Sequence, residues 1–167
     1  MANPIYKMGN NVSMGSWCVY DSRTVRFGAN VILEHFIEIQ DHCEIGDHVT
    51  IRSFCRIGHH CRIGAGATLK NGVILSPHIH IGTGVFVSPN VVFMNRQQED
   101  RAGTAVHANA FIGTGAIIAP GVTIGDHAFI AAGTLVSRDV PSGRAVAGSP
   151  MRELKTPARE LKRKVLG

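Results

Sequence analysis

The sequence predicts an all-β fold in which very short strands, joined by tight turns, wind into a stacked solenoid. Three observations favour this class: an apolar residue recurs every six positions, 19 of the 167 residues are glycine, and only 6% are aromatic. Apolar residues make up 44% of the chain and charged residues 17%, a balance typical of a folded domain and not of a disordered segment. A chain of this length fits one domain.

The six-residue repeat occupies most of the chain. Its first position is apolar in twelve successive hexads from Phe27 to Phe93, and the frame resumes one residue out of phase in six more hexads from Val106 to Val136. In the first block the fifth position is also small or apolar. Each hexad therefore provides two inward side chains and a turn, and three hexads would close one coil. The repeat predicts about six coils, stacked about 4.8 Å apart around an aliphatic core.

The repeat divides the chain into three parts. Residues 1–26 keep only traces of it, such as Val19 and Val25, and are predicted to form an N-terminal cap or partial coil. Residues 27–151 are predicted to form the solenoid. Residues 152–167 are predicted to form a basic C-terminal helix or tail.

Two segments depart from the repeat. Residues 95–104 are polar, interrupt the frame between two regular blocks and are predicted to protrude as a loop that carries binding residues. After the last hexad, Thr156 followed by Pro157 is typical of a helix start, and Leu161 and Val165 would give that helix an apolar side. We therefore expect a short C-terminal α-helix.

Charge and hydropathy exclude several classes of protein. Six basic against two acidic residues between positions 152 and 167 supply +4 of the net charge of +5, which argues against a broad nucleic-acid-binding face. No stretch approaches the roughly 18 apolar residues that a membrane span requires, and the first residues lack the apolar core of a signal peptide. We expect a cytoplasmic protein with no membrane span, no nucleic-acid partner and reduced, packed cysteines.

Several hexads resemble those of a known family. Residues 45–50 read Ile-Gly-Asp-His-Val-Thr, residues 63–68 read Ile-Gly-Ala-Gly-Ala-Thr and residues 124–129 read Ile-Gly-Asp-His-Ala-Phe. These repeats resemble the hexapeptide-repeat acyltransferases, and the resemblance covers most of the chain. It implies a left-handed parallel β-helix, a homotrimer with sites between subunits, and acetyl-CoA as co-substrate.

The end of the repeat resembles the closing segment of that family, where coenzyme A is bound. The resemblance implies coenzyme-binding positions on the last coils and the tail: Thr114, Ala132, Gly133, Ser137, Pro150, Arg152 and Lys155. Because one coil holds three hexads, Thr114, Ala132 and Pro150 are predicted to stack in one ladder, along which the pantetheine arm would lie. The Thr114 N–H would donate to the thioester oxygen as negative charge develops there.

The acceptor is indicated by residues 93–95. They read Phe-Met-Asn and resemble the Phe-Thr-Asn of nucleotide-sugar N-acetyltransferases of surface-polysaccharide biosynthesis, although Met94 and Arg96 depart from that pattern. The loop contains no histidine that could serve as general base for a hydroxyl, whereas an unprotonated amine attacks with less help. We therefore expect a nucleotide-linked amino sugar, with Asn95 orienting the amine or a water and with His78 and His107 as candidate bases.

The coil of three hexads also places His42, His60 and His78 along one edge and predicts Arg96 in the next position. Three histidines in register suggest a metal site. However, ladder neighbours repeat about every 4.8 Å and point side by side, as ordinary corner residues do. We expect no metal.

Two alternative functions remain open. The first is an O-acetyltransferase that uses His78 or His107 as base toward a sugar hydroxyl. The second is a non-catalytic trimeric solenoid that serves as a binding module. Loss of turnover in His78→Ala with Asn95→Ala nearly silent would favour the first, and absence of coenzyme binding would favour the second.

Overall fold

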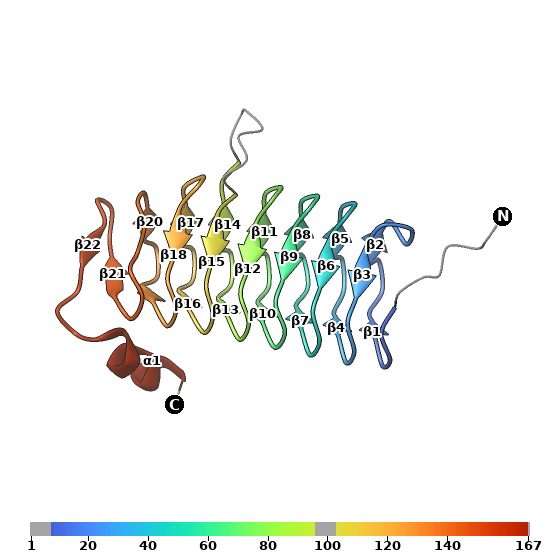
Figure 1. The fold of residues 1–167 in the computed structure, drawn as a ribbon, viewed down its shortest axis with the longest axis horizontal. Helices are drawn as coiled ribbons and strands as arrows, with labels where there is room; N and C mark the ends of the chain where they lie inside the picture. The colour runs from blue at the N-terminus through green and yellow to red at the C-terminus, as the bar shows by residue number, and fades with distance from the viewer. Residues whose placement is uncertain (1–7, 96–102, 167) are drawn as a thin grey trace.

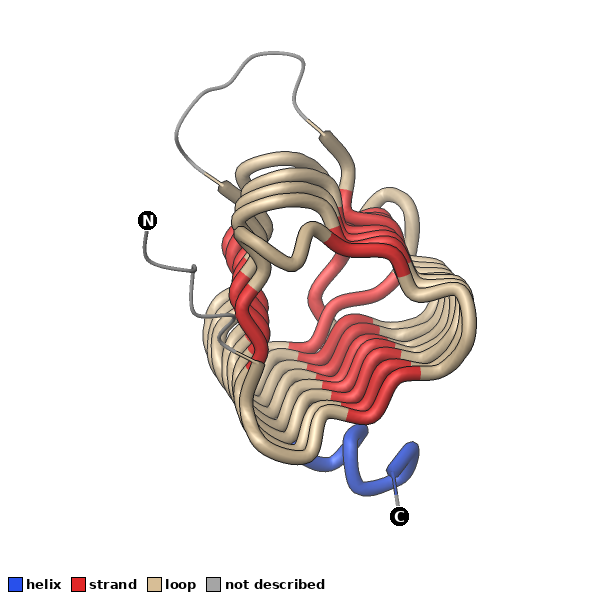
Figure 2. The backbone as a smooth tube through the Cα atoms, turned by 90° about the vertical axis from the view of Figure 1, so that its right-hand side faces the viewer, coloured by secondary structure: helices blue, strands red, loops and turns tan. Residues whose placement is uncertain are grey.

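A computed structural model describes residues 8–95 and 103–166 as a solenoid of about seven turns with one helix at its C-terminal end (Figure 1). Successive turns contribute strands to three sheets, which enclose a common interior when viewed along the solenoid axis (Figure 2). The predicted all-β solenoid and its C-terminal helix are confirmed.

The strands are almost all two residues long. Sheet 1 contains β1 (Ser13–Met14), β4 (Ile32–Leu33), β7 (Thr50–Ile51), β10 (Thr68–Leu69), β13 (Phe86–Val87), β16 (Phe111–Ile112), β19 (Phe129–Ile130), β21 (Ala145–Ala147) and β22 (Arg152–Glu153). Sheet 2 contains β2 (Val19–Tyr20), β5 (Glu38–Ile39), β8 (Arg56–Ile57), β11 (Ile74–Leu75), β14 (Val92–Phe93), β17 (Ile117–Ile118) and β20 (Leu135–Val136). Sheet 3 contains β3 (Arg26–Phe27), β6 (Glu44–Ile45), β9 (Arg62–Ile63), β12 (His80–Ile81), β15 (Ala105–Val106) and β18 (Thr123–Ile124).

The core runs the length of the solenoid. From β3 to β20 every strand buries its second residue, and these are the apolar first positions of the hexads, such as Ile51, Leu69 and Ile81, all with no exposed side-chain surface. The turns that link sheet 1 to sheet 2, sheet 2 to sheet 3 and sheet 3 to sheet 1 are called corners 1–2, 2–3 and 3–1. In the described turns, the exposed side chains therefore belong to outward strand positions or to corners. Equivalent residues of successive turns stack on one another and form ladders along the solenoid.

The solenoid begins earlier than the hexads predict. Met8 forms an isolated parallel bridge with Phe27, β1 pairs with β4 and β2 pairs with β5. Pairing therefore starts near the first described residue and adds about one turn to the six expected. This first turn is longer than a regular turn, in which Arg26 pairs with Glu44, because one extra residue lies between β2 and β3. The extra residue breaks the hexad frame in the sequence.

The polar segment between β14 and β15 shifts the register. His80 pairs with Ala105, so Gly103 lies above His78 and the predicted stacking of Arg96 on His78 is wrong. The turn from β12 to β15 therefore contains more residues than a regular turn. Arg96 and the rest of residues 96–102 lie outside the described residues.

The last turn is shorter than the others. Phe129 pairs with Ala145, so the position above Ala132 is Gly148. The predicted ladder of Thr114, Ala132 and Pro150 therefore holds only for its first two members. Pro150 lies instead in the connection between β21 and β22, which pair antiparallel.

The helix α1 (Ala158–Leu166) packs on sheet 1. Ala158 is buried in a cluster with Phe111, Phe129 and Ala145, while Phe86, Phe111 and Phe129 stack face to face along the sheet. This explains why β16 and β19 bury both of their residues. Among the residues described, no helix is long and apolar enough to cross a membrane.

Candidate functional site

A ladder of histidines lies along corner 2–3. His42, His60 and His78 each have a left-handed backbone, with φ of 56°, 57° and 61°. The His42 and His60 rings are parallel with centroids 4.8 Å apart, and the His60 and His78 centroids lie 5.1 Å apart. The predicted stacking of these three residues is confirmed, since each regular turn of three hexads repeats the corner.

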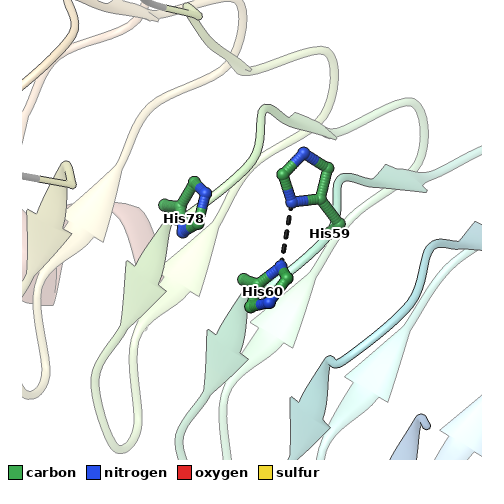
Figure 3. A group of neighbouring side chains, drawn as sticks. All are labelled: His59, His60 and His78. Carbon is green, nitrogen blue, oxygen red and sulfur yellow. Dashed lines mark hydrogen bonds between the residues drawn. The ribbon is translucent and has the colours of Figure 1, made fainter. Parts of the chain in front are cut away.

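His59 joins this ladder from the side (Figure 3). Its ring is nearly perpendicular to those of His60 and His78, and its Nδ1 lies 3.0 Å from the Nδ1 of His60. Sequence reasoning missed His59, because the position one turn before it is Asp41, so the two residue types differ and give no repeating ligand pattern.

A hollow of about 520 Å³ opens beside the histidine ladder. Its floor is a row of outward side chains on sheet 3, which consists of Arg26, Glu44, Arg62 and His80. Its upper end is formed by Gly103, Thr104 and Ala105, which follow the polar segment. The hollow therefore lies at the base of the predicted loop.

The sheet 3 row carries net positive charge. The Glu44 carboxylate lies 4.0 Å from an Arg26 nitrogen and 3.4 Å from an Arg62 nitrogen, so two guanidinium groups share one carboxylate. All three side chains are at least half exposed, which leaves guanidinium N–H groups available to an anionic ligand. Sequence reasoning missed this row, although the spacing of three hexads between its members would have shown it.

Asp41 lies at the lower end of the ladder. Its carboxylate is 2.9 Å from the Nδ1 of His42, and this hydrogen bond is the main cause that lowers the pKa of Asp41 below its usual range. Asp41 is therefore ionised at neutral pH and fixes the His42 ring.

Two of the three predicted catalytic residues come together at corner 2–3. Asn95 is exposed and follows β14 by two residues, and the register of Leu75 with Phe93 places it one turn above Pro77, beside His78. His78 lines the hollow directly, and Asn95 lies at the same corner.

His107 lies elsewhere. It is exposed and follows β15, at the opposite end of the sheet 3 strands, where it stacks on Gly82 at corner 3–1. Within one chain, His107 and His78 therefore do not face the same group.

Three predicted coenzyme-binding residues line corner 1–2. Thr114, Ala132 and Gly133 are at the surface in successive turns, and the Gly133 N–H donates to the Thr114 carbonyl at 2.9 Å. A Cβ on Gly113 would lie 2.5 Å from the Ala132 nitrogen, so glycine is needed for this close stacking. Among the described residues, the Thr114 N–H has no hydrogen-bond acceptor.

The buried Thr134 links this corner to the chain end. Its hydroxyl donates to the Ala131 carbonyl at 2.7 Å and accepts the Gly148 N–H at 3.3 Å. The connection from Gly148 to β22 is thereby held above Ala132 and Gly133. A small-residue track thus continues along corner 1–2 to the end of the solenoid.

The remaining predicted coenzyme-binding residues do not all lie on this track. Pro150, Arg152 and Lys155 are exposed in the segment from the β21–β22 connection to α1, on the same end of the solenoid. Ser137 follows β20 and lies at corner 2–3, so the whole width of sheet 2 separates it from Thr114. One chain therefore does not bring Ser137 and Thr114 to a single track.

The sequence matches two family models. A model described as bacterial transferase hexapeptide (six repeats) matches residues 24–59, 37–71 and 103–138. A model described as hexapeptide repeat of succinyl-transferase matches residues 55–89. The first model alone covers half of the chain, on both sides of the polar segment. No curated protein matches the sequence.

Solved structures with a similar fold include acetyltransferases. A maltose O-acetyltransferase from Clostridium difficile 630 is 29% identical, with a TM-score of 0.56 over 65% of this chain and 66% of that one. PerB from Caulobacter crescentus, in complex with CoA and GDP-perosamine, is 27% identical, with a TM-score of 0.52 over 85% of this chain and 58% of that one. A mutant of GDP-perosamine N-acetyl transferase from Caulobacter crescentus, also with CoA and GDP-perosamine, shares the fold at 24% identity and a TM-score of 0.59, over 86% and 58% of the two chains. The chain thus spans 58 to 66% of the length of these proteins.

Proposed function

Because the chain belongs to the bacterial transferase hexapeptide family, we propose that it is an acyl-CoA-dependent acyltransferase. Family membership also implies that the solenoid winds left-handed. We propose that acetyl-CoA is the donor and that the acceptor is the amino group of a nucleotide-linked amino sugar. The observation that carries this proposal is the hollow at corner 2–3, which is lined by cationic and imidazole groups, with Asn95 one turn above Pro77 at the same corner.

The hollow has the chemistry that a phosphorylated acceptor requires. Arg26 and Arg62 present guanidinium groups that match phosphate oxygens, and they are only partly neutralised by Glu44. PerB, which is 27% identical to this chain, was solved with CoA and GDP-perosamine. In the proposed complex the phosphates lie on the sheet 3 row and the sugar lies toward Asn95.

The donor is proposed to bind along corner 1–2. Small residues at Ala132 and Gly133 leave room for an extended pantetheine arm, and exposed Arg152 and Lys155 lie near the end of this track, where they would bind coenzyme phosphates. The Thr114 N–H would donate to the thioester oxygen.

The proposed reaction forms an amide and releases coenzyme A. The unprotonated amine attacks the thioester carbonyl, the oxygen takes up negative charge that the Thr114 N–H stabilises, and the C–S bond then breaks. The proton lost by the amine passes through Asn95-bound water or His78 to the leaving thiolate. Asn95 has no titratable group, so its part is to orient the nucleophile or the water.

The donor and acceptor surfaces lie on different corners, at either edge of sheet 2. In a three-fold arrangement with sheet 2 toward the axis, corner 2–3 of one chain would face corner 1–2 of its neighbour. This supports the proposed homotrimer, since neighbouring chains would join the two half-sites. It would also bring Ser137 of one chain toward the Thr114 track of the next.

An O-acetyltransferase is the second candidate function. The 29% identical maltose O-acetyltransferase favours it, and His78 lines the hollow where it would accept a proton from a sugar hydroxyl. The two candidates differ in what each needs: a hydroxyl needs a base, and an amine needs mainly orientation.

The coenzyme step is tested by calorimetric titration with acetyl-CoA. The wild type should bind with a micromolar dissociation constant, and Arg152→Ala should weaken binding about tenfold, as expected for the loss of one charge-assisted hydrogen bond. Arg163→Ala, an exposed change on α1, is the matched control and should bind as the wild type does. Absence of binding at millimolar acetyl-CoA would leave the non-catalytic solenoid.

The acceptor is tested by following thiol release from acetyl-CoA in the presence of nucleotide-linked amino sugars and of their hydroxyl analogues. Turnover only with the amino sugars, reduced strongly by Asn95→Ala and less by His78→Asn, supports N-acetylation. Turnover with the hydroxyl analogues, lost in His78→Asn and retained in Asn95→Ala, would establish the O-acetyltransferase instead.

A further inference from the structure

Corner 2–3 gathers five side chains that can ligate a metal ion. Two groups of three share His60: one consists of His59, His60 and His78, and the other of Asp41, His42 and His60. In each group the potential ligand atoms all lie within 4.8 Å of one another. These residues come from three successive turns, so no short sequence motif unites them.

The first group has the closer approach of imidazole nitrogens. The Nδ1 atoms of His59 and His60 are 3.0 Å apart, and the His59 ring stands nearly perpendicular to the stacked rings of His60 and His78 (Figure 3). Two such nitrogens in contact require a proton between them or a shared cation, because two lone pairs repel each other. The side-by-side geometry expected for a plain ladder therefore does not describe His59.

We propose that His59, His60 and His78 bind a divalent transition-metal ion such as Zn²⁺. A tetrahedral ion with nitrogen ligands at about 2.0–2.1 Å holds those nitrogens about 3.4 Å apart. Two nitrogens of the group already lie 3.0 Å apart, and all of its ligand atoms lie within 4.8 Å of one another, so small side-chain rotations would reach this separation. Imidazole ligands suit Zn²⁺, Ni²⁺ and Cu²⁺, whereas Mg²⁺ and Ca²⁺ prefer oxygen.

The backbone fixes the three ligands relative to one another. The His78 N–H donates to the His59 carbonyl at 3.0 Å, and the His59 N–H donates to the Gln40 side chain at 3.1 Å. Only side-chain rotations are then needed to close the site, and the exposed rings of His60 and His78 can make them. The fourth coordination position would face the hollow, which both residues line.

The second group serves better as support than as the site. His42 is already held by the Asp41 carboxylate at 2.9 Å, and its ring packs parallel to that of His60. A ring held in this way limits the rotation of the ligand ring that packs on it. The stack therefore restrains His60 from the side opposite to His78.

Zinc titration of chelator-treated protein tests the site without any assay of acyl transfer. Calorimetry should show one Zn²⁺ per chain with a micromolar dissociation constant, and Co²⁺ should give the visible absorption bands of a tetrahedral nitrogen-ligated ion. His60→Asn and His59→Gln should each weaken Zn²⁺ binding at least about tenfold.

Asparagine already occupies left-handed corner positions elsewhere in this chain, so the fold of the His60→Asn variant can be checked independently. Asn30, Asn90 and Asn109 adopt the same left-handed backbone as His60, so His60→Asn should keep the wild-type thermal unfolding midpoint. His127→Asn, also left-handed but at corner 3–1 and outside both groups, is the matched control and should bind Zn²⁺ as the wild type does. Equal Zn²⁺ affinity in the wild type and His60→Asn, or no tetrahedral Co²⁺ bands, would overturn the proposal.

Discussion

Three of the four cysteines point into the core at hexad positions. Cys43, Cys55 and Cys61 are buried, and their thiols donate to carbonyls one turn away, at 3.1, 3.1 and 3.2 Å. Burial raises the pKa of Cys55 to about 11. A thiol that stays protonated is a poor nucleophile, so Cys55 contributes packing and not chemistry. Cys43 and Cys61 have no exposed surface, so they too are shielded from reagents in solution.

We expect one thiol per native chain to react with a disulfide reagent at pH 8. That thiol is Cys18, which is only partly buried, and all four should react after unfolding in guanidinium. Absorbance of the released thiolate gives the count. Cys18→Ser should abolish the native reaction, and fast labelling of any thiol in that variant would contradict the packing.

Glu34 holds two adjacent turns together. Its carboxylate pairs with Arg52 and accepts hydrogen bonds from the Ser53 N–H at 3.1 Å and the Ser53 hydroxyl at 3.2 Å. The Arg52 hydrogen bond is the main cause that lowers the pKa of Glu34 below its ordinary value of 4.5. A carboxyl with a lowered folded-state pKa stabilises the fold above its unfolded pKa, and this stabilisation is lost as pH falls.

Glu34→Gln should therefore lower the free energy of unfolding at pH 7 by about 0.5–1 kcal/mol, the range of a partly exposed ion pair. The difference from the wild type should shrink as pH falls below about 4.5, the ordinary carboxyl pKa. Urea denaturation of both proteins at pH 7 and pH 3.5 measures this. An equal loss of unfolding free energy at both pH values would show that packing and neutral hydrogen bonds, and not the charge of Glu34, stabilise this contact.

At the scale of elements, the hexads predict the strands well and their stacking less well. A strict apolar period from Phe27 to Val136 is enough to place the buried strand residues, because each two-residue strand buries one of them. The register of Gly103 on His78 and of Gly148 on Ala132 depends on the number of residues in the turn, which is larger than in a regular turn in the first case and smaller in the second. The period holds no information on that number.

The candidate site was predictable to the same degree. Ladder arithmetic placed His78 on His60, and it could have placed Arg62 between Glu44 and His80. It could not give the perpendicular ring of His59, since the rotation of a side chain depends on contacts across turns. The sequence is enough to predict which residues share a corner. The approach of their ligand atoms to one another depends on side-chain rotations in the folded chain.

The docking of α1 gives a prediction for an element. Ala158 is fully buried between the helix and the phenylalanines of sheet 1, so Ala158→Asp places an unpaired carboxylate there and should release the helix. Because turns of a solenoid depend mainly on their neighbours, the unfolding midpoint of the turns far from α1 should change little. Limited trypsin digestion should cut at Arg159 and Arg163 much faster in the variant.

Retention of the wild-type digestion rate in Ala158→Asp would show that the helix is held by other contacts. Val165→Gln changes only an exposed helix residue and keeps both cleavage sites, so it serves as the control for a surface change on α1. The same variant pair also tests the coenzyme proposal, because Lys155 lies just before the helix. Weaker acetyl-CoA binding in Ala158→Asp alone would indicate that α1 positions the tail.

At the scale of the molecule, sheet 2 exposes an apolar stripe. Its outward residues Ile74, Ile117 and Leu135 are 38%, 41% and 36% exposed, and Val92 lies between the first two. Corner 1–2, at one edge of this sheet, also exposes the stacked rings of Phe36 and Phe54 in left-handed conformations that disfavour bulky residues. Exposed apolar side chains grouped in this way are typical of a contact surface.

We expect the stripe to face the three-fold axis of the proposed homotrimer, because sheet 2 lies between the corners that carry the proposed donor and acceptor surfaces. Light scattering coupled to size exclusion should give about 54 kDa, three times the chain mass of 17.9 kDa. Ile117→Glu places three carboxylates near the axis, where they repel and lose solvent, and should shift the mass toward one chain. Thr50→Glu, on the outward face of sheet 1, is the matched control and should keep the wild-type mass. A trimer that survives Ile117→Glu and dissociates in Thr50→Glu would place sheet 1 at the axis and separate the two half-sites.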